Sequence, residues 1–226
     1  MQTPTRTEET ATAARRLKLG EPIRCRDGVL GELADIVVDP EARRVTHLVA
    51  RADGGGGTKR LIPYELVDRA EGADRVSLDC TLADAHGLKQ AQELSYLPGG
   101  QLSENDPEWD IGVQDVFLVP RYDSSVFVDY QPEAEPEIMH MYDRIPKGHV
   151  EVRRESSITT ADGYPVGSLA GVVVEEQKLT HLILRSGHLW RRHSVMLPVS
   201  AVGALQTDEV IISCSKRELR GLPRCD

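Results

Sequence analysis

The stretch Thr46-His47-Leu48-Val49-Ala50-Arg51 recurs later in the chain as Thr180-His181-Leu182-Ile183-Leu184-Arg185. The flanking segments recur in the same order. Upstream, Asp27-Gly28, Gly31 and Ile36-Val37-Val38 match Asp162-Gly163, Gly167 and Val172-Val173-Val174. Downstream, Leu61-Ile62-Pro63 and Cys80 match Met196-Leu197-Pro198 and Cys214. So many ordered matches indicate an internal repeat of one structural unit.

Each repeat unit has the pattern of a small β structure. The Asp-Gly pairs favour hairpin turns, because glycine accepts a positive φ without a Cβ clash. The runs between the turns are short and rich in Val, Ile, Leu and Thr, as half-buried strands are. Such strands are too short and too few to form a well-covered open sheet, which favours closure into a barrel. A capping-box pattern, Thr81 with Asp84 and Ser215 with Glu218, predicts a short helix after each barrel.

These residues resemble the PRC-barrel family, the β-barrel module of the photosynthetic reaction centre H subunit and of the C-terminal half of the ribosome-maturation factor RimM. The shared features are the Asp-Gly turn, the glycine after it, the Val-rich strand, the Thr-His-Leu strand and the Leu-Pro step. The second unit is the more similar, from Tyr142 through Gly187-His188-Leu189-Trp190 to Leu197-Pro198-Val199, although Arg191 stands where a glycine is usual. The resemblance implies two small PRC-type β-barrels in tandem and protein–protein contacts, and it implies no catalytic residues.

The predicted organisation has four parts. A flexible N-terminal segment covers residues 1–16, the first barrel 17–88, an acidic linker 89–141 and the second barrel 142–226. Residues 83–149 hold 4 basic and 13 acidic side chains, so the net charge of −9 is concentrated there. An acidic chain without a basic face is a poor ligand for nucleic-acid backbones.

The linker is predicted to be partly ordered. Residues 83–149 contain seven of the ten aromatic residues of the chain, whereas disordered segments are poor in aromatics. Val116–Val119 and Val126–Val128 flank a polar turn, so a hairpin is predicted at 116–128. We expect these aromatics to pack on the chain's own barrels, with contact to a partner as the alternative.

No catalytic, cofactor or metal site is predicted. His47 and His181 occupy equivalent strand positions and are interpreted as hydrogen-bonded strand histidines, because no second ligand lies at a fixed spacing. His181, His188 and His193 would form a metal site only if their loops converged. Gly54–Gly57 precede Thr58-Lys59 in the wrong order for a phosphate-binding loop. The sequence has no Gly-x-Ser-x-Gly elbow, and its four cysteines are interpreted as free thiols.

The candidate protein-contact site is His188-Leu189-Trp190-Arg191-Arg192. This stretch follows Gly187 and lies between two predicted strands, so it is expected on a loop, where recognition residues are common. Trp and Arg are the side chains most often found at energetic hot spots. The alternative is that Trp190 closes the end of its barrel.

The sequence therefore predicts a non-enzymatic protein-binding or scaffold protein, and self-association is one form that such binding could take. No apolar run is long enough to span a membrane, and the first residues have no apolar core typical of a secretory signal. A cytoplasmic protein is expected. Two alternatives stay open: an assembly factor for a photosynthetic or ribosomal complex, and a sensor of a small molecule or metal.

Overall fold

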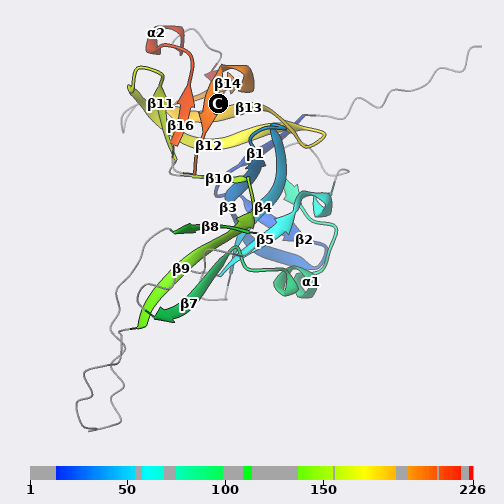
Figure 1. Ribbon diagram of the computed structural model, residues 1–226. Coiled ribbons are helices and arrows are strands. Elements are labelled where there is room, and N and C mark those ends of the chain that lie inside the picture. Colours follow the sequence, from blue (N-terminus) through cyan, green and yellow to red (C-terminus); the bar gives the residue numbers. More distant parts are fainter. Residues whose placement is uncertain are drawn as a thin grey trace, which may run out of the picture.

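The structure is a computed structural model, and it describes residues 14–53, 58–68, 75–98, 109–113, 137–154, 156–186, 193–207, 209–219 and 224–225. These residues are mainly β, and most of their strands join one curled sheet of 14 strands (Figure 1). The strands that carry the first half of this sheet are β1 (Arg15–Lys18), β2 (Pro22–Cys25), β3 (Gly28–Asp39), β4 (Arg44–Ala52), β5 (Lys59–Pro63) and β6 (Val76–Ser77). The second half contains β10 (Val150–Arg153), β11 (Ser157–Thr160), β12 (Pro165–Glu175), β13 (Lys178–Ser186), β14 (His193–Pro198), β15 (Val202–Leu205), β16 (Glu209–Ile212) and β17 (Arg224–Cys225).

The repeated sequence segments form equivalent strands. Thr46–Arg51 lies in β4 and Thr180–Arg185 lies in β13, as strands were predicted there. In both units the following strand runs antiparallel to this one, with His47 opposite Pro63 and His181 opposite Pro198. A short 3-10 helix follows in each case, η1 (Tyr64–Leu66) and η2 (Val199–Ala201). The repeat in sequence therefore corresponds to a repeat in strand pairing.

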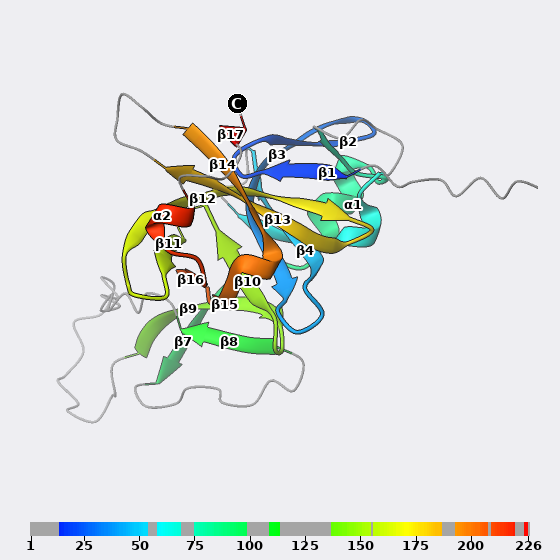
Figure 2. The same cartoon turned by 90° about the horizontal axis from the view of Figure 1, so that it is seen from above.

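The two units exchange their first strands. β1 pairs antiparallel with β12, so that Leu17 lies opposite Val172 in the second unit. Conversely, β10 pairs with β3, so that Val152 lies opposite Ile36 in the first unit. Figure 2 shows β1 beside the strands of the second unit, although it is the first strand of the chain. β1 begins at Arg15, and Arg15 and Arg16 thus belong to the segment 1–16 that the sequence assigned to a flexible terminus.

The hairpin turns of the two units also meet. The Val45 amide donates to the Gln177 carbonyl at 2.8 Å, and the Leu179 amide donates to the Arg43 carbonyl at 2.8 Å. Arg43 and Gln177 both have positive φ values, 51° and 70°, which turn the chain tightly enough for this contact. A single buried core contains Leu17, Ile36 and Leu48 together with Val152, Val172 and Leu182. The two units are thus parts of one sheet with one core, and no separate sheet for each unit is present in the described residues.

Two short helices follow strands β6 and β16. α1 (Leu82–Gly87) begins with the predicted capping box, in which the Asp84 amide donates to the Thr81 hydroxyl and the Thr81 amide donates to the Asp84 carboxylate. α2 (Lys216–Leu219) has the corresponding contact, because the Ser215 amide donates to the Glu218 carboxylate at 2.8 Å. Among the described residues, no helix has the length and apolar character needed to cross a membrane.

The linker contributes a second sheet. Its strands are β7 (Gln92–Pro98), β8 (Trp109–Val113) and β9 (Glu137–Pro146), with β9 in the centre. Figure 1 shows this sheet beside the first unit. Some linker residues are therefore in strands, whereas the hairpin predicted at 116–128 lies outside the described residues.

Candidate functional site

The residues singled out from the sequence are only partly within the described chain. His188-Leu189-Trp190-Arg191-Arg192 lies outside the described residues, between the end of β13 at Ser186 and the start of β14 at His193. Gly54–Gly57 also lies outside them, between β4 and β5. The site that the structure does describe is the outer face of the sheet, which is the face opposite the shared core.

His47 and His181 occupy the same place on this outer face, one in each unit. Both are half-buried, and each has its Nδ1 atom 3.2 Å from the hydroxyl of the preceding threonine, Thr46 or Thr180. Burial lowers the pKa of His47, while the nearby Glu65 carboxylate acts in the opposite direction. In the part of the chain that the structure describes, no group of three or more His, Cys, Asp or Glu side chains could hold a metal ion.

The linker covers the outer face of the first unit. The Leu61 amide donates to the Lys89 carbonyl at 2.9 Å, and the Ala91 amide donates to the Lys59 carbonyl at 3.0 Å. These bonds extend the sheet beyond β5 and bring Ala91 and Ile145 onto the apolar side chains of this face. The resulting cluster consists of Ala34, Val37, Val49, Leu61, Ala91 and Ile145. We call it the first outer cluster.

The second unit has an equivalent cluster, which includes no linker residue among those that the structure describes. The second outer cluster consists of Ala170, Val173 and Ile183, with Met196 packed against them. Strand pairing gives the correspondence, because Val49 lies opposite Leu61 and Ile183 lies opposite Met196. Within the described chain, the linker therefore covers one of two equivalent faces.

Each face also carries a surface pocket. The first pocket has a volume of about 310 Å³, and its lining is largely charged: Glu32, Asp35, Arg51, Lys59, Arg153 and Arg154. The second pocket has a volume of about 250 Å³. Its floor is apolar, with Ala170, Ile183 and Met196 from the second outer cluster, and its polar lining is Arg16, Lys18, Glu21, Arg185 and Ser194.

Buried ion pairs lie at or beside the first pocket, where the exchanged strand β10 pairs with β3. Lys59 Nζ lies 2.7 Å from Asp35 Oδ2, and these side chains are 13% and 6% exposed. Arg153 lies 2.7 Å from Glu151, whose side chain is 1% exposed. Burying a charge is costly unless a partner and hydrogen bonds compensate it. Sequence analysis missed these pairs, although the alternation Val150-Glu151-Val152-Arg153 places Glu151 and Arg153 on one face of a strand.

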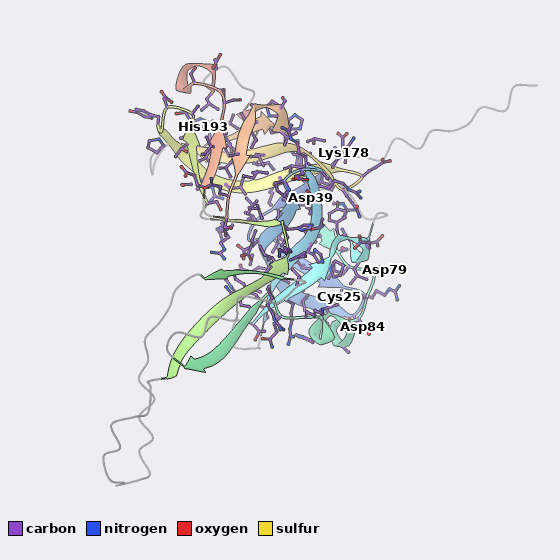
Figure 3. The ribbon with its side chains drawn as sticks, in the orientation of Figure 1. Cys25, Asp39, Asp79, Asp84, Lys178 and His193 are labelled. Carbon is purple, nitrogen blue, oxygen red and sulfur yellow. The ribbon has the colours of Figure 1, made fainter. Side chains whose placement is uncertain are left out.

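Two cysteines meet beside α1, and Figure 3 shows Cys25 near Asp79 and Asp84 at that end of the first unit. The Sγ atoms of Cys25 and Cys80 are 4.0 Å apart, and both side chains are buried. Burial raises the pKa of Cys25 to about 12, with a smaller contribution from Cys80. Burial also raises the pKa of Cys80 and of Cys214. Because the thiolate is the reactive form, none of these three thiols is suited to nucleophilic catalysis near neutral pH.

We expect the native chain to protect Cys25 and Cys80 from alkylation. With a pKa of about 12, on the order of one Cys25 thiol in ten thousand is ionised at pH 8. Iodoacetamide at pH 8 should label the half-buried Cys214 before Cys25 and Cys80, which should be labelled only after urea unfolding. Peptide mass spectrometry measures the labelled fraction at each cysteine. Labelling of Cys25 at the same rate in native and unfolded chain would contradict its burial.

No protein-family model matches the sequence, and a comparison with curated proteins finds no matching relative.

Proposed function

We propose that this chain is a non-catalytic protein-binding or scaffold protein, built from two PRC-type barrels, whose contact surface is the outer face of the second unit. The repeat, the equivalent strand pairing and the resemblance in sequence support the PRC-type assignment. The raised pKa values of three thiols support the absence of a cysteine nucleophile.

One observation carries the choice of surface. In the first unit, Val49 and Leu61 are packed against Ala91 of the linker and against Ile145 near the end of β9. Their equivalents in the second unit, Ile183 and Met196, line a surface pocket, in which Ile183 is buried and Met196 is half-buried. A half-buried methionine in a pocket, at the position of a buried leucine in the other unit, supports the face of the second unit as a binding surface.

The sequence between β13 and β14 supports the same choice. These two strands contribute Ile183 and Met196 to the pocket. Trp190 and its neighbouring arginines, which were predicted as contact residues, stand in the sequence between them. Trp and Arg are the side chains most often found at energetic hot spots of interfaces.

The test compares partners captured by three forms of the full chain. Met196→Asp places a charge on the pocket floor and should abolish capture of a specific partner, because burying an uncompensated carboxylate opposes binding. Val29→Asp is the matched control, since Val29 is 42% exposed on β3 of the other unit. Mass spectrometry identifies the captured proteins, and light scattering measures self-association of the same samples. Equal unfolding midpoints in urea establish that the variants are folded. If every captured protein and the oligomeric state stay the same in Met196→Asp, the surface is wrong.

A further inference from the structure

The repeat provides an internal comparison between the two pockets, because register assigns each lining residue of one unit an equivalent in the other. Glu32 lies opposite Arg51 across β3 and β4, and Ser168 lies opposite Arg185 across β12 and β13. Asp35 is equivalent to Gly171, because Asp35 lies opposite Val49 and Gly171 lies opposite Ile183. On the exchanged strands, Glu151 is equivalent to Arg16, because Glu151 lies opposite Val37 and Arg16 lies opposite Val173.

In the first unit, three cations are neutralised by carboxylates of the chain itself. Arg51 lies 2.7 Å from Glu32. Lys59 lies 2.7 Å from Asp35. Arg153 lies 2.7 Å from Glu151. Three of the four cations that line the first pocket are therefore paired with carboxylates of the chain, and Arg154 is the fourth.

In the second unit, all three carboxylates are missing. Glu32, Asp35 and Glu151 correspond to Ser168, Gly171 and Arg16. A side chain cannot be accommodated at Gly171, because a Cβ there would lie within 3.0 Å of the Leu17 carbonyl oxygen on the exchanged strand. The carboxylate of Asp35 thus has no possible counterpart in this backbone.

The cations, by contrast, are largely retained. Arg185 corresponds to Arg51 and Lys18 to Arg153, and Arg16 adds a third positive charge. Among the described lining residues of the second pocket, Glu21 is the only acid, and it lies 3.3 Å from Lys18. The guanidinium groups of Arg16 and Arg185 have no ion pair within the described part of the chain. The pocket therefore combines two uncompensated guanidinium groups with an apolar floor.

We infer that the second pocket binds a carboxylate group of a ligand. This carboxylate would pair with Arg185 as Glu32 pairs with Arg51 in the first unit. Arg185 and Arg16 donate charge-assisted hydrogen bonds to the carboxylate, which the planar guanidinium accommodates well. Ala170, Ile183 and Met196 pack against the carbon chain attached to it. This inference rests on the proposed function, because the pocket lies on the proposed contact face. The carboxylate belongs either to a free organic acid or to an acidic side chain of a bound protein.

Calorimetric titration of the full chain at low salt tests the inference with two probes, succinate and a glutamate-rich peptide. Saturable binding of succinate identifies a site for a free acid, and binding of the peptide alone identifies a site for a protein-borne carboxylate. Arg185→Gln should weaken either interaction by roughly tenfold or more, because a hydrogen bond to a charged group is lost. Arg51→Gln is the matched control and should leave binding unchanged, since Arg51 is already paired with Glu32.

A second variant tests the comparison between the units directly. Ser168→Glu introduces a carboxylate at the position that Glu32 has opposite Arg51 in the first unit. The new carboxylate should form an ion pair with Arg185, and it should abolish binding of both probes while preserving the fold. The inference is overturned if neither probe binds the wild-type chain, or if Arg51→Gln and Arg185→Gln weaken binding equally. The wild-type chain could capture a partner that Met196→Asp does not capture, and yet bind neither probe. That result would support the proposed function and reject the carboxylate site.

Discussion

Replacing Gly31 with alanine is expected to destabilise the native fold severely. A Cβ at this position would lie within 3.0 Å of the Arg51 carbonyl oxygen, a separation that real Cβ atoms essentially never show. The obstacle is the backbone of β4, so no side-chain rotation relieves it, and β3 and β4 would have to separate. Gly167 meets the Arg185 carbonyl oxygen in the same way. We expect each substitution to cost more than about 4 kcal/mol of unfolding free energy.

Urea unfolding followed by circular dichroism measures this effect. Gly203→Ala is the matched control, because a Cβ at Gly203 would lie 3.5 Å from the Ile211 carbonyl oxygen, which is ordinary contact. The control should change the unfolding free energy by less than about 1 kcal/mol. A Gly31→Ala chain with a wild-type midpoint would show that β3 and β4 do not approach as closely as described.

Replacing Glu151 with alanine should cause the largest loss of stability among the carboxylates that pair with cations of the first pocket. The Glu151 side chain is 1% exposed, and its partner Arg153 is 17% exposed. The substitution removes the carboxylate that Arg153 binds at 2.7 Å, and breaking a buried ion pair costs roughly 3–5 kcal/mol. Because β10 carries both residues and pairs with β3, the loss should destabilise the junction of the two units.

Glu32→Ala is the control for this prediction. Glu32 and Arg51 form an ion pair of the same length, but their side chains are 38% and 52% exposed. Solvent screens such a pair, and its removal should cost about 0.2–1 kcal/mol. Chemical denaturation of both variants provides the comparison, and equal losses of free energy would contradict the buried role of Glu151.

The sequence predicted the local structure well, because the local signals are physical requirements of the backbone. The repeated Thr-His-Leu segments are in strands, and Thr81 caps α1 with Asp84 as expected. Gly31 and Gly167 repeat because a neighbouring carbonyl occupies the space of a side chain in both units. Each of these features depends on few residues and on short-range sterics or hydrogen bonds.

The exchange of first strands could not be predicted from the repeat. A repeat reveals which segments are alike but not which copy each segment pairs with. Leu17 is a suitable neighbour for Ile36 of its own unit and for Val172 of the other, since both are β-branched core residues. The paths of the connections between strands determine which pairing forms, and the sequence pattern does not indicate these paths. The second pocket was missed for the same reason, because Arg16 and Arg185 meet only through the exchange.

The strand exchange has a consequence for synthesis of the protein. Residues 35–38 of β3 receive their second neighbour only from β10, which is translated more than a hundred residues later. A nascent chain that contains the first unit alone therefore presents an unpaired strand edge, the kind of edge that recruits foreign strands. Contacts between such distant parts of a chain also slow folding. The two halves should consequently gain stability together after translation, in a single cooperative step, and the first half should depend on chaperones until the second half has emerged.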